Sequence, residues 1–595
     1  METEESQTQR RWLFPRLKLR VWLAELFHFS ELQVTLFWAG VIGFAGGLSS
    51  VAFRRVTDGV HWLFTRQHTG YVESFMHLVW WQRLIIPAVG GVLAGLVIYF
   101  GTRIARKSST DYMEAIVLGD GVISFRSSAV KCLSAMFSIA SGASIGREGP
   151  LVQLSAVLAS LVGRWRKVPA LQLRLLVACG ASAGIASAYN SPIGGALFVA
   201  EIVLQSLAME TFGPLVFASV VATLTIRRLI GESPLYEIQI PNVRLHTNWE
   251  ILPYMLLGLL AGFVAPWFLR LLRGSEKLFS KLPLPLYLRI GLGGLTVGAL
   301  AILHPEVCGN GYSVINELLH QQMVWEVLLV IFICKLLATA ATFGSGAVGG
   351  VFTPTLFAGA CLGVLFCDVV QRLWIGPTLV PAAFALVGMG AFLAATTHAP
   401  LMAIIIVFEL TLDYDIILPL MLACIVAHYT CSAFEKNSVY SESLKRKGGD
   451  DYSRHLASLS VGDLMKPNPV AVGEAARFNE IAENFIGNRF NYLYVIDDHR
   501  QFRGAISLHD IKSYLNDPEL AQFIIARDIL RESIPTILPE DSLATALERF
   551  SKHDGERLPV ISSNNGDRLL GSISKTDVLL ALTEQSREKP ADPAT

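Results

Sequence analysis

Charged residues are scarce in this sequence: Asp, Glu, Lys and Arg make up 16% of its 595 residues, whereas soluble domains carry about 25%. Neither sign is in excess, because Lys and Arg together number 49 and so do Asp and Glu. This balance argues against a strongly basic nucleic-acid binder, and 52% AVILMFWYC excludes a disordered chain. The scarcity is local: 41 of the last 150 residues are charged, against 57 of the first 445. We therefore expect a membrane domain followed by a soluble domain.

The sequence also lacks paired cysteine motifs. Its eight cysteines all lie in the apolar part, and none forms a Cys-x-x-Cys pair. Neither a zinc site nor a disulfide framework is therefore expected, and we interpret the thiols as buried and inert. The start has no apolar run followed by a small-residue cleavage site, so we expect no signal peptide. Basic residues between positions 10 and 20 favour a cytoplasmic N-terminus.

What the first part does contain is a series of apolar stretches, many interrupted by glycine or proline. Several are shorter than the roughly 20 residues that a straight membrane crossing needs. Between residues 327 and 408 the only charges are Lys335, Asp368 and Arg372. Non-helical backbone at membrane depth is tolerated where it is buried in protein or lines a cavity. This pattern is typical of a transporter or channel core rather than of an anchor.

The apolar part contains an internal repeat. Lys131 and Lys335 lie 204 residues apart, and so do Pro150 and Pro354, which each end a glycine-rich loop. The further matches are Asn190–Pro192 with His398–Pro400, at an offset of 208, and Gly119–Gly121 with Gly309–Gly311, at an offset of 190. Transporters with internal repeats bind their substrate between the repeats, at broken helix ends.

A second duplication follows a short polar linker at 445–450. The matched segments are 463–465 with 528–530, 492–497 with 557–562, and 504–510 with 571–577. Each copy has the pattern helix, strand, strand, helix, which predicts a pair of α+β units.

These residues carry a family resemblance. Gly146–Pro150 (GREGP) and Gly350–Pro354 (GVFTP) resemble two signature loops of the CLC chloride channel and transporter family. Gly119–Gly121 sits where the family's third loop sits, and Tyr440 resembles its pore tyrosine. The segments Gly309–Ser313 and Thr396–Pro400 look closest to the bacterial ClcB-type branch, and residues 455–583 resemble a tandem pair of CBS modules.

The resemblance implies an all-α polytopic membrane domain with two inverted repeats, followed by an α+β tandem CBS domain. It implies a homodimer in the cell inner membrane, with one pore per subunit and the N-terminus and CBS domain in the cytoplasm. The boundaries we predict are an N-terminal segment at 1–30, a membrane ion-transport domain at 31–447, CBS modules at 455–515 and 520–583, and a tail at 584–595.

The two proline-ended loops have the chemistry of an anion site. A helix N-terminus leaves its first backbone N–H groups unpaired and carries about half a positive charge. Glycines let such groups approach an ion closely, and binding without a full positive charge is weak enough for the ion to leave. The candidate ion-binding residues are Gly146, Arg147, Gly149, Val351, Phe352, Tyr440 and Asp120. Arg147 is the one for which we favour a structural role over ion contact.

Glu148 is the candidate gate and proton acceptor. The dipole that would attract an anion also holds a carboxylate at a helix N-terminus. Its carboxylate can therefore occupy the anion's place, and protonation would release it. The alternative is a carboxylate that only caps its helix; an ionisable residue inside a membrane favours function.

Two positions depart from the family pattern. Asp120 stands where the third loop commonly offers a serine hydroxyl. An ionised aspartate would repel chloride, so Asp120 must point away, be protonated or change the selectivity. Ile202 stands where proton-coupled members often carry a second, intracellular glutamate, just after Glu201. Its hydrocarbon side chain cannot relay a proton, which puts proton coupling in doubt without excluding it.

Five further ionisable residues have matched positions in the repeats. Glu201 and Glu409 each follow a matched proline by nine residues, and we favour structural roles for them over a proton relay. His398 is interpreted as a structural residue rather than a pH sensor. Lys131 and Lys335 either raise the pore potential for anions or pair with carboxylates or carbonyls inside the bundle, which we favour slightly.

The CBS pair is a candidate site for an adenine nucleotide. Asp510 and Asp577 could accept hydrogen bonds from ribose hydroxyls, and Ser507 or Ser574 could contact phosphate. The tail has no Walker loop, so nucleotide hydrolysis is not predicted. A purely structural dimerisation module is an equal alternative.

Four functions compete. The first is a chloride/proton antiporter gated by Glu148, and the second a passive voltage- or pH-gated chloride channel. A cation transporter would place acidic rings in its pore, which the sparse carboxylates argue against, apart from Asp120. An enzyme or receptor ranks last because no nucleophile–base pair or metal cluster stands out. We expect chloride as substrate, protons and lipid as partners, no nucleic acid, and no required cofactor.

Overall fold

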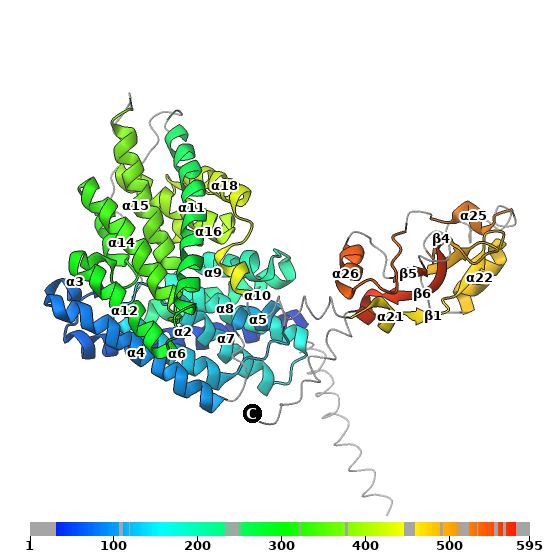
Figure 1. Cartoon of the computed structure of the whole chain (residues 1–595), viewed down its shortest axis with the longest axis horizontal. Helices are drawn as coiled ribbons and strands as arrows, with labels where there is room; N and C mark the ends of the chain where they lie inside the picture. The colour runs from blue at the N-terminus through cyan, green and yellow to red at the C-terminus, as the bar shows by residue number, and fades with distance from the viewer. Residues whose placement is uncertain are drawn as a thin grey trace, which may run out of the picture. The chain divides into compact units, whose positions relative to one another are not determined.

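The computed structural model contains two compact units, Met1–Leu444 and Lys445–Thr595, whose helices and strands are labelled in Figure 1. The described residues are 31–105, 111–117, 119–231, 236, 249, 251–320, 323–374, 379–444, 459–487, 492–508, 511, 523–531, 534–551, 557–562 and 567–578. The segment predicted at 1–30 and the tail predicted at 584–595 lie outside these ranges.

The first unit is built of helices. They are α2 (Glu31–Thr65), α3 (Tyr71–His77), α4 (Trp80–Ala105), α5 (Tyr112–Val117), α6 (Phe125–Ala140), α7 (Glu148–Trp165), α8 (Ala170–Tyr189), α9 (Pro192–Leu197), η1 (Phe198–Leu204), α10 (Met209–Leu229), α11 (Ile251–Ser280), α12 (Leu286–Leu303), η3 (Pro305–Val307), α13 (Tyr312–His320), α14 (Trp325–Gly344), α15 (Phe352–Gln371), α16 (Pro381–Thr397), α17 (Pro400–Thr411), α18 (Ile417–Phe434) and α19 (Val439–Leu444). Within the described ranges, nine helices are long and apolar enough to cross a membrane.

Two helices form the centre of this unit. In α16 every residue from Ala382 to Thr397 is buried, and the helix packs against α11, α15 and α18. A helix that is apolar all round belongs inside a protein rather than at its surface. Its counterpart α8 is buried from Leu176 to Tyr189 and packs against α2, α7 and α10.

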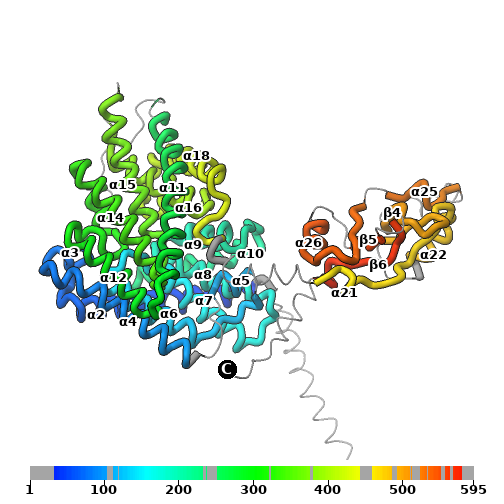
Figure 2. Tube along the Cα trace, viewed as in Figure 1, coloured from blue at the N-terminus to red at the C-terminus, as the bar shows by residue number. Residues whose placement is uncertain are grey.

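The internal repeat is visible in the order of the helices. The series α7, α8, α9 recurs as α15, α16, α17, and Figure 2 shows the blue-to-cyan half lying against the green-to-yellow half. Asn190 and His398, 208 residues apart, end α8 and α16 in the left-handed conformation, with φ of 57° and 58°. This conformation is uncommon outside glycine, so its recurrence at matched positions supports an internal duplication.

The second unit contains two small sheets. Its elements are α21 (Val461–Leu464), β1 (Lys466–Pro467), β2 (Ala471–Gly473), α22 (Phe478–Gly487), β3 (Tyr492–Ile496), β4 (Phe502–Ser507), α25 (Ala526–Ile529), α26 (Leu543–Ser551), β5 (Arg557–Ser562) and β6 (Arg568–Ser574). One sheet has the order β2-β3-β4 and the other β1-β6-β5. In the first, β2 and β3 are parallel and β3 and β4 antiparallel; in the second, both pairs are antiparallel.

The segment that precedes each copy packs on the other copy. Val461 in α21 is fully buried in the cluster that holds Ile537, Leu558 and Ile573 of the second copy, and β1 pairs with β6. Conversely, α25 packs in the cluster of the first copy. Figure 1 shows α21 and β1 beside β6, and α25 beside α22. The two copies therefore exchange their leading segments, which the sequence pattern did not reveal.

This exchange predicts where a mutation in α21 acts. Val461→Ala removes about two methylene equivalents, so the second copy should lose about 2 kcal/mol of stability. Hydrogen exchange followed by mass spectrometry should show faster exchange in β5 and β6 than in β3 and β4. The matched variant Ile529→Ala should show the reverse. Faster exchange confined to β3 and β4 in Val461→Ala would contradict the exchanged packing.

Candidate functional site

Two matched glycines cross at the centre of the first unit. The Gly146 N–H donates to the Gly350 carbonyl at 2.7 Å, and the Gly350 N–H donates to the Gly146 carbonyl at 2.9 Å. The bridge is antiparallel, and its two residues are separated by the 204-residue repeat offset. Equivalent backbones that run in opposite directions and bond to each other are what an inverted repeat requires at its pseudo-twofold axis.

A side chain at either of these two positions would displace the Glu148 carboxylate. A Cβ built on either Gly146 or Gly350 would lie within 3.0 Å of the Glu148 carboxylate. Real Cβ atoms essentially never approach other atoms that closely. The two glycines therefore leave the space in which this carboxylate lies.

The bridge between Gly146 and Gly350 brings the N-termini of α7 and α15 close together. Helix α7 begins at Glu148 and helix α15 at Phe352, in each case two residues after the paired glycine. Pro150 and Pro354 stand in the first turns, where a missing N–H leaves no intrahelical bond unmade. Both positive helix ends thus approach the same buried region.

The Glu148 side chain crosses from its own helix to the N-terminus of α15. Its Oε1 accepts the backbone N–H groups of Phe352 at 2.9 Å and Thr353 at 3.4 Å. Its Oε2 accepts the Thr353 hydroxyl at 3.2 Å. Glu148 is only 3% exposed. We call the position between these three donors the carboxylate site; its donors are neutral groups at a helix N-terminus, so it suits a small anion.

Two hydroxyl groups at this site were not predicted from the sequence. Thr353 occupies the fourth position of the GVFTP loop, and its Oγ1 lies 3.1 Å from the hydroxyl oxygen of Tyr189. Tyr189 is the last residue of α8. The one signal in the sequence is that both are hydroxyl residues next to matched segments.

Tyr440, in α19, is connected to the start of α15 through the ring of Phe198. Its ring packs edge-on against Phe198, with 5.4 Å between centroids, and Phe198 packs against Phe352 at 6.3 Å. The predicted aromatic residue is therefore brought toward the N-terminus of α15. Val351 and Gly149 are part of the two helix starts, as N-cap of α15 and second residue of α7.

Arg147 takes a position beside the carboxylate site rather than in it. It is the N-cap residue of α7, and its guanidinium carbon lies 5.7 Å from the centroid of the Tyr312 ring. Such a contact is worth about 0.5–1 kcal/mol at an exposed site and about 2 kcal/mol when desolvated. The contact supports the structural role favoured for Arg147.

The structure does not bring Asp120, one of the candidate ion-binding residues, to the carboxylate site; of the three alternatives for this residue, the structure shows the one in which it points away. Its side chain is exposed, and its loop is fixed by Ser160, which donates to the Gly121 carbonyl and accepts the Ile123 N–H. Ser160 lies twelve residues along α7 from Glu148, about 18 Å at 1.5 Å per residue.

Helix α5 lies nearer to the site than Asp120 does. The backbone N–H of Tyr112, its first residue, donates to Gln153, five residues along α7 from Glu148. The segment that leads into α5, 106–110, lies outside the described residues. The structure therefore places the first residue of α5, rather than the Gly-x-Gly segment after the helix, nearer to the carboxylate site.

Glu201 and Glu409 cap each other's repeat. Glu201 accepts the N–H groups of Leu401 and Met402 at the start of α17. Glu409, in α17, accepts those of Ile193 and Gly194 at the start of α9 and also the Ser191 hydroxyl. These bonds support the structural roles favoured from the sequence. Ile202 is buried in η1, directly after Glu201.

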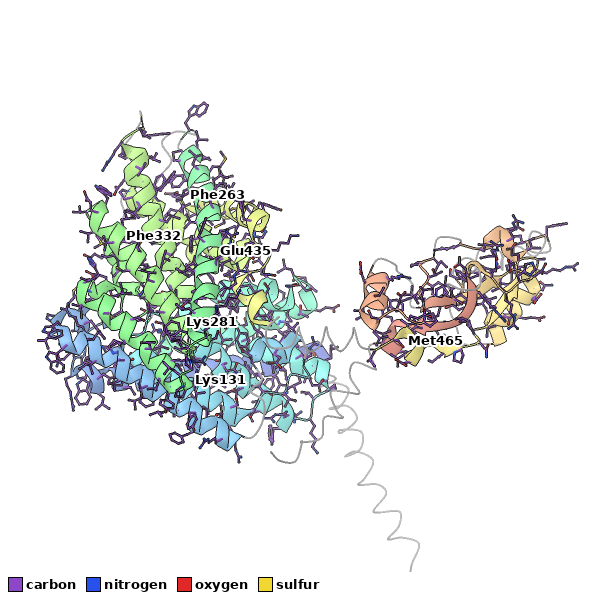
Figure 3. The ribbon with its side chains drawn as sticks, in the orientation of Figure 1. Lys131, Phe263, Lys281, Phe332, Glu435 and Met465 are labelled. Atoms are coloured by element: carbon purple, nitrogen blue, oxygen red, sulfur yellow. The ribbon has the colours of Figure 1, made fainter. Side chains whose placement is uncertain are left out.

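Lys335 is a buried cation that bonds to carbonyl groups. Its Nζ donates to the carbonyls of Val307 at 2.9 Å and Gly309 at 2.8 Å and lies 5.1 Å from the Phe357 ring centroid. This is the carbonyl pairing that the sequence analysis favoured. Its repeat counterpart Lys131 lies half-buried on α6 (Figure 3).

His398 occupies a structural position at the end of α16. Its backbone N–H donates to the Ala394 carbonyl, and its ring lies edge-on to that of His428 at 5.6 Å. Among the described residues, its buried Nε2 has no hydrogen-bond partner. The ring is therefore not fully satisfied, although the residue serves as a helix cap.

In the second unit, Ser574 and Asp577 form one local cluster. The Asp577 N–H donates to the Ser574 hydroxyl at 3.0 Å, and Lys466 of β1 donates to Asp577 Oδ1 at 3.1 Å. Burial raises the pKa of Asp577, but hydrogen bonds from Ser574 and Lys466 outweigh it and hold the pKa below its usual range. Ser507 is buried at the end of β4; Asp510 lies outside the described residues.

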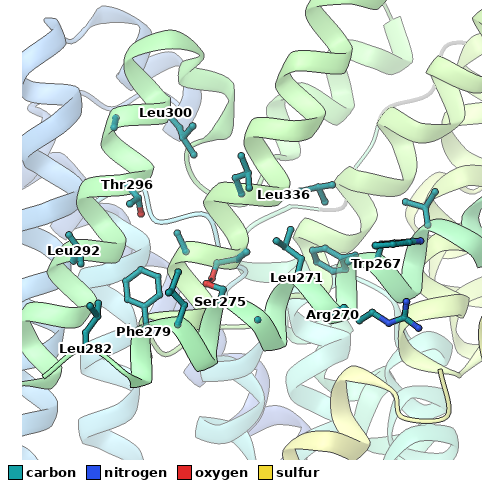
Figure 4. A pocket seen from close by; sticks show the side chains of 18 residues that line it. Trp267, Arg270, Leu271, Ser275, Phe279, Leu282, Leu292, Thr296, Leu300 and Leu336 are labelled. Carbon is teal, nitrogen blue, oxygen red and sulfur yellow. Dashed lines mark hydrogen bonds between the residues drawn. The ribbon is translucent and has the colours of Figure 1, made fainter. Parts of the chain in front are cut away.

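A separate cleft of about 1170 Å³ lies between α11, α12 and α14. Figure 4 shows that aliphatic and aromatic side chains, such as Phe279, Leu292 and Leu336, line most of it. None of the residues at the carboxylate site line it. Its walls offer an anion few hydrogen-bond donors, so the cleft is not part of the candidate site.

Comparison with known proteins agrees with this geometry. The sequence pattern of the voltage gated chloride channel family matches residues 89–432, and that of the CBS domain matches 461–517 and 526–584. A ClcB-like chloride channel protein of Ralstonia nicotianae is 49% identical over 417 residues, 69% of this chain and 97% of that protein.

Two solved structures share the fold. The crystal structure of a slow cyanobacterial Cl−/H+ antiporter has a TM-score of 0.62 at 25% identity, over 70% of this chain and 98% of that chain. That of a eukaryotic CLC transporter has a TM-score of 0.60 at 19% identity, over 92% and 99%. These findings confirm the predicted resemblance and the fold class, an all-α membrane domain with inverted repeats and an α+β tandem CBS domain.

The reciprocal caps predict a stability effect. Glu409→Gln removes the charge and replaces one of the two acceptor oxygens by an NH2 group, which can only donate, so the free energy of unfolding should fall by about 2 kcal/mol. Thermal unfolding of the purified protein in detergent should show a lower Tm. Glu210→Gln, at an exposed position in the first turn of α10, is the control and should lower Tm much less, because an exposed carboxylate at a helix N-terminus contributes about 0.3–1 kcal/mol. An equal Tm for both variants would contradict the capping role.

Proposed function

Because the chain belongs to the voltage gated chloride channel family, we propose that it moves chloride across the membrane in exchange for protons, with Glu148 as gate and proton acceptor. The observation that carries this proposal is the place of the Glu148 carboxylate. It occupies a buried site whose donors belong to the N-terminus of α15. A carboxylate and a chloride ion cannot occupy that site together.

Exchange follows from this competition. As a carboxylate, Glu148 blocks the route and neutralises the donors at the start of α15. A proton taken up by Glu148 removes its charge, the side chain leaves the site, and chloride takes its place beside the N–H groups of Phe352 and Thr353. When chloride leaves, the carboxylate releases its proton and returns. Backbone donors and a tyrosine bind chloride without a full positive charge, so that the ion can also leave.

The second candidate is a passive voltage- or pH-gated chloride channel. Ile202 favours it, because this position has no ionisable group and the buried side chain lies in η1. The relative from Ralstonia nicotianae is also named a channel, whereas the solved structure at 25% identity is named an antiporter. In the exchange mechanism, water must carry protons past Ile202.

The proposal includes location and assembly. Basic residues ahead of the first span and the charged second unit favour a cytoplasmic N-terminus and CBS domain in the cell inner membrane. Family membership supports a homodimer with one pore per subunit, surrounded by lipid. The mechanism requires no cofactor.

For the CBS pair, we propose an adenine nucleotide as regulator. Asp577 keeps an ionised carboxylate next to Lys466, and its Oδ2 has no hydrogen-bond partner among the described residues. A ribose hydroxyl could donate to that oxygen, and Ser507 and Ser574 lie at the corresponding strand ends β4 and β6. Asp510 is the matched carboxylate of the first copy.

Proton coupling is the test of the transport proposal. Full-length protein in liposomes is given a chloride gradient, and the external pH is followed. We expect the wild type to drive protons uphill and Glu148→Ala to conduct chloride without moving protons, since alanine can neither block nor carry a proton. Asp120→Asn is the control and should behave as the wild type. Chloride flux without proton movement in the wild type would make the protein a channel.

Nucleotide binding is tested on the full-length protein in detergent. Titration calorimetry with ATP, ADP and AMP should detect one of them, and Asp577→Asn should weaken its affinity about tenfold, as expected for a lost charge-assisted hydrogen bond. Asp498→Asn, in the turn after β3, should leave the affinity unchanged. Absence of binding for all three nucleotides would favour a purely structural module.

A further inference from the structure

We propose that the hydroxyl group of Thr353, held in place by Tyr189, is a further ligand of the transported anion and favours chloride over larger anions. The proposal rests on the proposed function, because it assumes that the anion takes the place of the Glu148 carboxylate. It concerns side-chain hydroxyls, in addition to the backbone donors of α15.

The three groups form one continuous chain of hydrogen bonds. The Tyr189 hydroxyl lies 3.1 Å from Thr353 Oγ1, which lies 3.2 Å from Glu148 Oε2. Thr353 is fully buried and Tyr189 is 1% exposed. The Tyr189 ring packs against Phe352 with 4.8 Å between centroids, so the phenol oxygen is held by packing as well as by its hydrogen bond.

The number of hydroxyl protons fixes which group donates and which accepts in each of these hydrogen bonds. A threonine hydroxyl has one proton, and the ionised Glu148 carboxylate can only accept. The Thr353 proton therefore points to Glu148, and Tyr189 donates to one of the two lone pairs of Thr353 Oγ1. Each hydroxyl thus donates toward the carboxylate site, and donation from Tyr189 polarises the Thr353 hydroxyl and strengthens its own donation.

An anion in the carboxylate site meets the same donors. When Glu148 leaves, the N–H groups of Phe352 and Thr353 and the Thr353 hydroxyl face the vacated position. Chloride accepts from all three without any reorientation of the hydroxyl chain. Donors that are already oriented add affinity because their ordering cost is not incurred on binding.

The hydroxyl pair belongs to one repeat only. At the repeat offsets, Thr353 corresponds to Gly149, and Tyr189 corresponds to Thr397. Glycine has no side chain, and the Thr397 hydroxyl donates back to the Leu393 carbonyl of its own helix. The pair is therefore not a general feature of the duplicated fold; it occurs where the carboxylate site lies.

A fixed hydroxyl donor discriminates among anions. A hydrogen bond to a small ion of concentrated charge is stronger than one to a large ion whose charge is spread over several atoms. A rigid ligand set also fits one ionic size best. Loss of the hydroxyl should therefore weaken chloride binding more than thiocyanate binding.

The experiment uses full-length protein carrying Glu148→Ala, in which the carboxylate site is open to anions. Chloride and thiocyanate affinities are measured by titration calorimetry after Thr353→Val, Thr353→Ser and Tyr189→Phe are added one at a time. Valine keeps the shape of threonine without its hydroxyl. Thr355→Val is the matched control, because the buried Thr355 hydroxyl donates to the Val351 carbonyl in the same helix.

We expect Thr353→Val to weaken chloride binding about tenfold, as for a lost hydrogen bond to a charged group, and to weaken thiocyanate binding clearly less. Thr353→Ser should retain chloride affinity, and Tyr189→Phe should lower it about threefold. The double variant Thr353→Val/Tyr189→Phe should bind chloride as Thr353→Val does, because Tyr189 acts through Thr353.

Unchanged chloride affinity in Thr353→Val, or an equal loss in Thr355→Val, would overturn the proposal. So would a normal affinity in Tyr189→Phe, since the oriented chain would then contribute nothing. These measurements do not depend on proton coupling, which Glu148→Ala removes. A failure of the exchange proposal in liposomes is therefore distinguishable from a failure of this one.

Discussion

The carboxylate site at the start of α15 depends on the pair of backbone hydrogen bonds between Gly146 and Gly350. These bonds hold the starts of α7 and α15 together, and the missing side chains leave the space in which the Glu148 carboxylate lies. The two glycines are repeat equivalents. One pair of bonds therefore joins the repeats at the place where the Glu148 carboxylate lies.

Carboxylates of one repeat cap helices of the other throughout this centre. Glu148 binds the start of α15, Glu201 the start of α17, and Glu409 the start of α9. Each bond satisfies backbone N–H donors that would otherwise be unpaired. An unpaired backbone donor away from water costs free energy. With Glu148 as the proposed gate, the same interaction has two uses: it stabilises the joint between repeats at Glu201 and Glu409, and it closes the ion route at Glu148.

Much of this centre could be predicted from the sequence because glycine, proline and carboxylate residues recur at fixed offsets. The 204-residue offset marks the helix starts that the structure joins, and the 208-residue offset marks the two left-handed caps. Asp120 was misplaced for a reason visible in the same numbers. Its Gly-x-Gly match has an offset of 190, which disagrees with the other two, and so short a pattern does not identify a helix start.

Other features could not be predicted because they depend on contacts across the fold. Thr353 has no hydroxyl counterpart in the other repeat, where Gly149 stands, and Tyr189 is 164 residues away from it in sequence. The exchange of leading segments between the CBS copies depends on Val461 packing with residues about a hundred positions later. Sequence patterns indicate which local structures form, but such pairings become evident only when the chain has folded.

The central claim is that a single buried site at the start of α15 holds either the Glu148 carboxylate or the transported anion. It is tested most directly by crystals of wild type and Glu148→Ala grown in bromide, with anomalous difference maps at the bromine edge. The account predicts a bromide ion beside Phe352 and Thr353 in Glu148→Ala and none at that position in the wild type. Bromide at that position in both proteins, or in neither, would contradict it.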